Sequence, residues 1–283
     1  MAARPRIAIA HDYLTQRGGA ERVVLSMAKA FPDAAIYTTL YDPDATYPEF
    51  ADLHVITTGL NRISALRRHH RLAFPFLAPT VSATPIDADL VVASSSGWAH
   101  GFNASGKKLV YCHAPARWLY QPEAYLGGSK FGSLTGLMLA ATSPALRVWD
   151  RRMSRGADLY LCNSTIVRER IADAYSIRAT VLPPIAIDST GAEEPVVGLL
   201  DWEDSYLLVV ARLLPYKNVQ QIIEAVRDTS HRLVVVGSGP LEATLAASAP
   251  SNVRFEANLS DERMRWVYSH CTYLIAASIE DYG

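Results

Sequence analysis

The sequence predicts an α/β protein of two doubly wound domains, each a parallel sheet with helices on both faces. Continuous apolar runs of four or five residues alternate with helical patterns along the whole chain, which is typical of strands buried on both faces. The chain has 283 residues, of which 49% are hydrophobic and 19% charged, so it is long enough for two domains with real cores. Residues 1–190 carry a net charge of +5 and residues 191–283 one of −6. This division of charge also indicates two bodies.

The first domain is placed at residues 1–190. Its buried strands and helices are read from the apolar runs and from the turn residues between them. We expect strands at 7–10, 36–39, 90–93, 109–112 and 159–162, and helices at 20–31 and directly after Asn163-Ser164. Residues 188–204 mix Ser, Thr, Gly, Pro and acids, which indicates a linker, placed at 191–204.

The second domain is placed at residues 205–283, where the same alternation begins again. We expect four strands, at 206–210, 233–236, 253–255 and 273–276, and helices at 219–227, after 237–240 and at 261–270. The pattern stops after the fourth strand without a closing helix, so the second domain is expected to be truncated.

Composition excludes several classes of protein. The apolar content argues against disorder, and no apolar run approaches the roughly 18 residues of a membrane-spanning helix. The first residues do not form a signal peptide, so we expect a cytoplasmic protein. Three widely spaced cysteines have no metal-binding spacing and are interpreted as reduced core thiols. Two Asp-x-Asp triplets, at 42–44 and 87–89, are interpreted as turns or caps rather than metal ligands.

Residues 53–86 contain no acid but carry four arginines beside histidines, leucines and phenylalanines. A basic, amphipathic segment of this kind can bind an anionic membrane surface or an anionic lipid. A solvated helix face that is merely basic explains the pattern equally well. The arginines are Arg62, Arg67, Arg68 and Arg71.

Two segments that follow predicted strands are candidates for binding phosphate. Gly18 and Gly19 follow the first strand and precede a helix, whose free N–H groups favour an anion, although glycines also serve ordinary turns. Arg212 and Lys217 follow the first strand of the second domain. Because ligands of open α/β sheets bind at the carboxyl ends of strands, this pair could clamp a diphosphate. A surface salt-bridging pair is the alternative.

Two further patterns are weaker. Gly237 and Gly239 begin a sequence similar to a dinucleotide-binding fingerprint, but Glu242 occupies the third glycine position and would repel a pyrophosphate. This residue disfavours an NAD-dependent oxidoreductase, although a nucleotide could still touch the loop. His113 ends another strand, where it could contact a sugar hydroxyl or the reacting phosphate, or be purely structural.

A set of short motifs runs through the chain from its first strand to its last residues. The motifs are His11-Asp12-Tyr13-Leu14, Gly18-Gly19-Ala20-Glu21, Tyr111-Cys112-His113-Ala114-Pro115, Asn163-Ser164, Val181-Leu182-Pro183-Pro184, Arg212–Asn218, Val236–Pro240 and Glu280-Asp281-Tyr282-Gly283. Taken together and in order, they resemble the retaining glycosyltransferases of family 4, which have the GT-B fold of two Rossmann-like domains. The first domain is most similar to bacterial mannosyltransferases that act on lipid-linked saccharides or build surface polysaccharide.

The resemblance implies a sugar nucleotide bound mainly by the second domain, in the cleft between domains. Arg212 and Lys217 would hold the donor diphosphate and stabilise the leaving phosphate without a metal or other cofactor. The Gly18-Gly19 loop would close over the phosphate and the acceptor, and His113 would contact the transferred sugar. Glu280 would be the first acid of the family's Glu-x7-Glu pair. The acceptor would be lipid-linked or a saccharide, on or near the inner face of the membrane, and no nucleic acid is expected.

The sequence departs from the family pattern in two places. Glu256-Ala257-Asn258 replaces a common glycine, which affects the expected contacts with the base. The second acid of the Glu-x7-Glu pair, which would bind the ribose, falls at position 288, beyond the printed chain. We therefore expect a fragment or a shortened chain with weak activity. The alternative function is a catalytically inactive remnant that still binds nucleotide.

Overall fold

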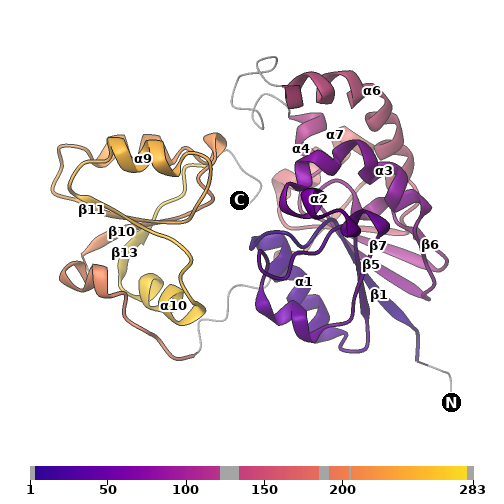
Figure 1. Ribbon diagram of the computed structural model, residues 1–283, viewed down its shortest axis with the longest axis horizontal. Coiled ribbons are helices and arrows are strands. Elements are labelled where there is room, and N and C mark those ends of the chain that lie inside the picture. The colour runs from indigo at the N-terminus through magenta and orange to yellow at the C-terminus, as the bar shows by residue number, and fades with distance from the viewer. Residues whose placement is uncertain (1–3, 122–133, 185–190, 204, 279–283) are drawn as a thin grey trace. The chain divides into compact units, whose positions relative to one another are not determined.

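The computed structural model describes residues 4–121, 134–184, 191–203 and 205–278. It divides the chain into two compact units, residues 1–185 and residues 186–280 (Figure 1). Each unit is an open parallel sheet with helices on both of its faces. The predicted α/β class with two doubly wound sheets is therefore confirmed.

The first unit is built on a seven-stranded parallel sheet in the order β3-β2-β1-β5-β7-β8-β9. Strand order reverses direction between β1 and β5, which makes the carboxyl end of these two strands the topological switch point of the sheet. The strands are β1 Ile7–His11, β2 Ala35–Thr38, β3 Val55–Thr57, β5 Leu90–Ser95, β7 Lys107–Cys112, β8 Leu159–Cys162 and β9 Thr180–Val181; a separate pair joins β4 Pro85–Ile86 to β6 Asn103–Ala104.

Helices cover both faces of the first sheet because successive strand residues point to opposite sides. Ile9 and Ile36 pack under α1 on one face, whereas Ala8, Ala10 and Val91 belong to a larger core on the other face. Figure 1 shows α1 on one side of β1 and β5, with α2 and α3 on the other. The helices are α1 Gly19–Ala30, α2 Ser64–Arg68, α3 Phe74–Ala83, α4 Arg117–Tyr120, α6 Leu134–Ser154 and α7 Thr165–Tyr175.

Local signals fix several of these elements. The Ser164 hydroxyl caps α7 by accepting a hydrogen bond from the Val167 N–H at 3.3 Å, as expected of an N-cap serine.

Cys112 and Cys162 are buried in the first core, Cys271 is half-buried, and all three are free thiols, in line with the sequence prediction. Burial raises the pKa of the Cys112 thiol. No helix in the described ranges is long and apolar enough to cross a membrane.

The segment 53–86 is more tightly packed than its basic composition indicates. Leu66 and Leu77 are buried in the first core. The ring of His70 stacks on Tyr13 at 4.5 Å, and its Nδ1 lies 3.2 Å from the Thr15 hydroxyl. Only the outer side of the segment is exposed, where Arg62 and Arg68 lie in the same stretch as Ile63, Leu72 and Phe76, whose side chains are 51–58% exposed. The side chain of Arg71 lies outside the described residues.

The second unit has a four-stranded parallel sheet in the order β12-β11-β10-β13, so its switch point lies between β10 and β13. One core packs under α8 and α9 and the other under α10. Figure 1 shows α9 and α10 on opposite sides of the strands. The elements are β10 Tyr206–Val210, α8 Val219–Val226, β11 Arg232–Val236, α9 Glu242–Ser248, β12 Val253–Glu256, α10 Asp261–Ser269 and β13 Cys271–Leu274.

The stretch expected as a linker, 191–204, packs on the second unit in its described part. It contains the 3-10 helix η5 (Val197–Trp202), and its Leu199 and Trp202 are buried against the core beside α10. The Arg254 guanidinium lies 4.0 Å from the centre of the Trp202 ring and forms a salt bridge with Asp201. The Ser, Gly and acidic residues of 191–204 indicated a linker and obscured three apolar residues, at positions 196, 199 and 202. Their spacing of three places them on one side of a short helix, and that side is buried.

Candidate functional site

Four buried polar side chains form a row at the carboxyl ends of β1, β5 and β7. The Nε2 of His11 lies 3.8 Å from the Glu21 carboxylate, and its Nδ1 lies 3.1 Å from both the hydroxyl and the carbonyl oxygen of Ser94. The Ser94 hydroxyl lies 2.8 Å from the Nε2 of His113. None of the four is more than 6% exposed. We refer to Glu21, His11, Ser94 and His113 as the polar row.

The fold explains why these residues meet. Strand register pairs His11 directly with Ser94 across β1 and β5. His113 follows β7, where its backbone N–H donates to the Ser95 carbonyl at 2.9 Å and its own carbonyl accepts from the Asn163 amide at 3.2 Å. Glu21 lies in the first turn of α1 and points inward. The row thus lies at and beside the switch point of the first sheet.

Electrostatics separate the two histidines of the row. Burial opposes the charge on His11, but the nearby Glu21 carboxylate outweighs it, and the pKa of His11 is raised. Burial likewise opposes the Glu21 carboxylate, yet His11 and the Gln16 amide, which donates at 3.0 Å, lower its pKa. Burial and the positive charge of His11 instead lower the pKa of His113 to about 3. His113 is therefore neutral at neutral pH, whereas His11 and Glu21 each favour the charged form of the other.

Gly18 has a structural part in this row. Its φ is −142°, which any residue can adopt, but a Cβ at this position would lie 2.5 Å from the Glu21 carboxylate. The absence of a side chain at the N-cap of α1 therefore gives the carboxylate its room. Gly19 is the first helical residue of α1. Contact of Gly18 or Gly19 with a ligand stays a prediction.

Of the two acidic triplets, the one at 42–44 has the turn role that the sequence predicts, since the Asp42 carboxylate accepts from the Asp44 N–H at 3.3 Å in an Asx turn. At 87–89, Asp87 instead forms a salt bridge with Arg6. Among the described residues there is no group of three or more His, Cys, Asp or Glu that could hold a metal ion.

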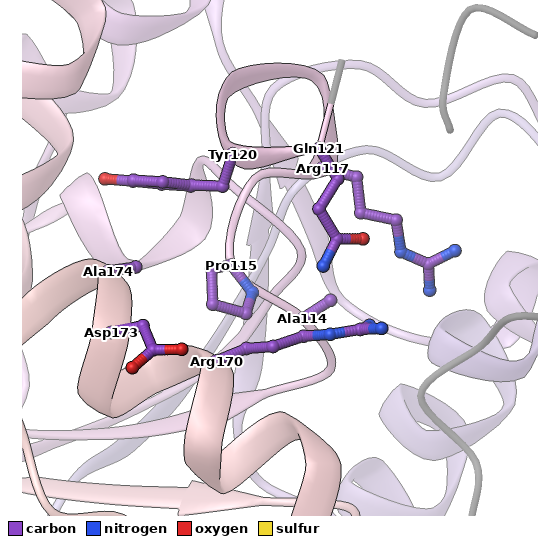
Figure 2. Close-up of a pocket in the computed structure, with 8 residues that line it drawn as sticks. All are labelled: Ala114, Pro115, Arg117, Tyr120, Gln121, Arg170, Asp173 and Ala174. Carbon is purple, nitrogen blue, oxygen red and sulfur yellow. The ribbon is translucent and has the colours of Figure 1, made fainter. Parts of the chain in front are cut away.

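A pocket of about 180 Å³ opens beside the polar row in the first unit. Its lining begins at Ala114, the residue after His113, and includes the side chains of Arg117 on α4 and Arg170 on α7. Figure 2 shows both guanidinium groups on the same side of the pocket with the Gln121 amide, and the Asp173 carboxylate on the other side. Arg170 could not be predicted from the sequence, because an arginine on an amphipathic helix has no local signal for binding. The complete lining is Ala114, Pro115, Arg117, Tyr120, Gln121, Arg170, Asp173 and Ala174.

In the second unit, Arg212 and Lys217 lie in the turn between β10 and α8, as predicted. Arg212 is exposed, and Lys217 is half-buried with its ammonium group 5.6 Å from the centre of the Tyr216 ring. The turn closes as a short 3-10 helix, η6 (Pro215–Lys217), and Asn218 then begins α8 with a positive φ of 53°. Both cations therefore occupy the carboxyl end of β10, at the switch point of the second sheet and beside the start of α8.

Gly237 and Gly239 hold this turn in place through backbone packing. Their φ angles are 151° and 157°, which L side chains rarely adopt. A Cβ at Gly237 would overlap the Ala211 carbonyl oxygen, and one at Gly239 would lie 2.6 Å from the Leu213 carbonyl oxygen. The two segments are also joined by the Leu213 N–H, which donates to the Ser238 carbonyl at 2.9 Å. Packing alone thus requires both glycines, and their contact with a nucleotide stays a prediction.

The predicted site residues therefore form two described groups. Gly18 and His113 belong to the surroundings of the polar row in the first unit, with Gly19 next to Gly18 at the start of α1. In the second unit, Gly237 and Gly239 pack on Ala211 and Leu213, the neighbours of Arg212, and Lys217 lies further along the same turn. Glu280 lies outside the described residues. His11 and Glu21 lie within sequence motifs, but no local signal marks them or Ser94 as a buried group, since their burial together arises from strand pairing rather than from local sequence.

Solved structures of glycosyltransferases resemble this chain over nearly its whole length. Anabaena HepE, in complex with UDP and glucose, is 16% identical, with 97% of this chain and 74% of HepE covered and a TM-score of 0.61. Sucrose-phosphate synthase from Thermosynechococcus elongatus is 14% identical, with 98% and 77% covered and a TM-score of 0.61. An α-glucosyltransferase in complex with UDP is 11% identical, with 98% and 74% covered and a TM-score of 0.50. At these identities the likeness shows the fold, which is that of the GT-B glycosyltransferases.

The family model of Glycosyltransferase Family 4 matches residues 17–186, more than half of the chain. The chain thus belongs to glycosyltransferase family 4. The matched range contains the Gly18-Gly19 loop, His113 and the pocket beside it. No curated protein sequence matches the chain significantly. The resemblance predicted from the motifs is confirmed at the level of a GT-B glycosyltransferase.

Proposed function

We propose that this enzyme moves a hexose, with mannose as the first candidate, from a nucleoside diphosphate sugar to a lipid-linked or saccharide acceptor, with retention of configuration. The observation that carries the proposal is the Arg212–Lys217 turn at the switch point of the second sheet. The product would enter cell-surface polysaccharide or glycolipid, and the enzyme would work in the cytoplasm.

The second unit offers what a diphosphate needs. Arg212 presents a planar guanidinium and Lys217 a compact ammonium, and both precede the N-terminus of α8, which itself favours an anion. These two cations would neutralise the charge that develops on the leaving phosphate, the task that a divalent ion performs in other phosphate sites. The UDP held by HepE and by the α-glucosyltransferase, which share this fold, supports a nucleoside diphosphate donor.

Replacing Arg212 or Lys217 with alanine should weaken nucleoside diphosphate binding far more than nucleoside binding. A charge-assisted hydrogen bond is worth about 1.5–3 kcal/mol, so each variant should lose roughly 10–150-fold in affinity for GDP or UDP. Calorimetric titration of each variant with the diphosphate and with the bare nucleoside measures this difference.

Arg227→Ala is the matched control, since Arg227 lies at the other end of α8 in an exposed ion pair with Glu224. It should bind GDP and UDP as the unmodified chain does. Equal losses for diphosphate and nucleoside in the Arg212 and Lys217 variants would contradict the clamp. Tight nucleotide binding without any sugar transfer would instead favour the inactive, nucleotide-binding alternative.

On the acceptor side, the pocket of the first unit favours an acceptor that carries phosphate. Two guanidinium groups and one carboxylate give its lining an excess of positive charge. Arg147 and Arg151 donate to the Leu119 and Ala174 carbonyl oxygens beside it, which adds further positive charge. A lipid-linked saccharide joined through phosphate fits this charge better than a neutral saccharide does.

We also propose that the exposed side of residues 53–86 contacts an anionic membrane. Exposed arginines beside exposed apolar side chains are the combination that docks on such a surface. The double variant Arg62→Gln/Arg68→Gln should lose about 10–30-fold in binding to anionic vesicles, since each basic residue contributes about 1 kcal/mol near the surface. Liposome sedimentation at two salt concentrations measures it, because salt weakens the attraction.

The matched control is Arg152→Gln/Arg155→Gln, which removes two exposed arginines at and just after the end of α6 in the same unit. Equal vesicle binding by the two double variants would show that net charge, and not this segment, drives the contact. Binding of the unmodified chain to neutral vesicles as strong as to anionic ones would also contradict the proposal.

A further inference from the structure

The polar row determines which ring nitrogen of His113 carries the proton. The Nδ1 of His11 carries a proton, because the Ser94 carbonyl oxygen lies 3.1 Å away and can only accept a hydrogen bond. The same Nδ1 lies 3.1 Å from the Ser94 hydroxyl, and the Nε2 of His11 faces the Glu21 carboxylate at 3.8 Å. With His11 as a donor on its other side, the Ser94 hydroxyl directs its only proton to the Nε2 of His113, 2.8 Å away.

His113 itself is neutral, because burial and the charge of His11 hold its pKa at about 3. A neutral imidazole has one N–H and one acceptor nitrogen. Since the Nε2 accepts from Ser94, the proton of His113 lies on Nδ1. With so low a pKa, His113 is deprotonated at neutral pH and has no proton to give as a general acid, which leaves its N–H available for hydrogen bonding.

The Nδ1 of His113 is buried and has no hydrogen-bond partner in the part of the chain that the structure describes. Unpartnered buried donors are rare, because each one costs free energy that a partner would recover. His113 also lies at the carboxyl end of β7, next to the switch point of the sheet, where ligands of this fold class bind. The Nδ1–H therefore matches a ligand that brings an oxygen acceptor.

We propose that Glu21, His11 and Ser94 are positioning residues that fix His113 as an Nδ1–H donor for an oxygen atom of the substrate. The ligand class is a sugar hydroxyl or a phosphate oxygen, which accept such a bond. The proposal deepens the proposed function, on which its ligand rests, but the tautomer follows from the row alone.

The test reads the tautomer directly by nitrogen-15 NMR of histidine-labelled protein, with the His113 signals assigned from the His113→Gln spectrum. The unmodified chain should show the proton on Nδ1 of His113 at neutral pH. Ser94→Ala removes the donor to Nε2 and should shift the population toward the Nε2–H form.

Ser95→Ala is the matched control, because Ser95 is the next residue of β5, equally buried, and its hydroxyl lies 3.0 Å from the Nδ1 of a different histidine, His100. It should leave the His113 signals unchanged. A proton on Nε2 in the unmodified chain, or an unchanged tautomer in a folded Ser94→Ala variant, would overturn the proposal. The spectrum of the unmodified chain gives this answer even if Ser94→Ala does not fold.

A second readout tests the ligand. If the acceptor is a sugar hydroxyl, Ser94→Ala should weaken binding of GDP-mannose or UDP-glucose by about 2–10-fold, the range of one neutral hydrogen bond, and leave binding of GDP or UDP as it was. If the acceptor is a phosphate oxygen, the sugar nucleotide and the nucleotide should lose affinity equally. No loss for either ligand in a folded Ser94→Ala variant would contradict the contact. If neither sugar nucleotide binds the unmodified chain, the proposed donor is wrong, and the tautomer measurement still decides the role of the row.

Discussion

Replacing His11 with leucine should cost the first unit about 3–5 kcal/mol of unfolding free energy, because the Glu21 carboxylate then stays buried without its cation. The double variant His11→Leu/Glu21→Met should recover most of this loss, since removing both charges leaves no buried ion unpaired. Hydrogen exchange of the β1 and β5 amides under mild denaturant reports on the first unit alone. A double variant less stable than His11→Leu would contradict a paired charge at this position.

The pair should also give stability a defined pH dependence. The pKa of His11 is raised above 6.5, so its contribution is complete below pH 6.5 and is lost as pH rises through the folded-state pKa. The pKa of Glu21 is lowered below 4.5, so its contribution is complete above pH 4.5 and is lost as pH falls through the folded-state pKa. The stability difference between the unmodified chain and the double variant should therefore peak between pH 4.5 and 6.5. A difference that does not change with pH would show that the pair is uncharged.

Gly237→Ala should destabilise the second unit by about 2–6 kcal/mol, the sum of backbone strain at a positive φ and of overpacking. The φ of 151° disfavours any Cβ, and the Ala211 carbonyl oxygen occupies the place of the new methyl group. Because neither the β10 turn nor the β11 turn can move without losing the Leu213–Ser238 hydrogen bond, the clash has no inexpensive relief. Hydrogen exchange of the β10 and β11 amides measures the loss.

Gly198→Ala is the control within the same unit. The nearest atom to a Cβ at Gly198 is a carboxylate oxygen of Glu256, 3.3 Å away. This oxygen is the end of a flexible side chain and can move aside. This variant should therefore change stability by less than about 1 kcal/mol. If Gly237→Ala proves equally mild, the two turns are less tightly joined than their backbone geometry indicates. If Gly237→Ala also weakens diphosphate binding while remaining folded, the packing of the turn positions Arg212.

Much of the fold could be predicted from local sequence. Runs such as Leu90–Ala93 are apolar throughout because strands of a parallel sheet are buried on both faces, and the structure places β5 there. Ser164 indicated the start of α7 because a serine hydroxyl satisfies a helix N-terminus. In contrast, α2, α3 and α6 were not predicted. Their apolar residues are interrupted by arginines, histidines and prolines, and α3 and α6 contain internal prolines at Pro79 and Pro144.

The candidate site likewise has one part that could be predicted from the sequence and one part that could not. The apolar run before Arg212 and Lys217 is enough to predict that both follow a strand, and therefore that they lie at the ligand-binding edge of a sheet. The contacts of His11 with Glu21 and Ser94, and of Ser94 with His113, could not be predicted in this way, since register between β1 and β5 pairs residues 83 positions apart. Hydrophobic periodicity reports only on residues that are close together in the sequence, so it predicts helices and strands but not which of them meet. The charge state of a histidine depends instead on burial and on partners that distant strands and helices bring to it.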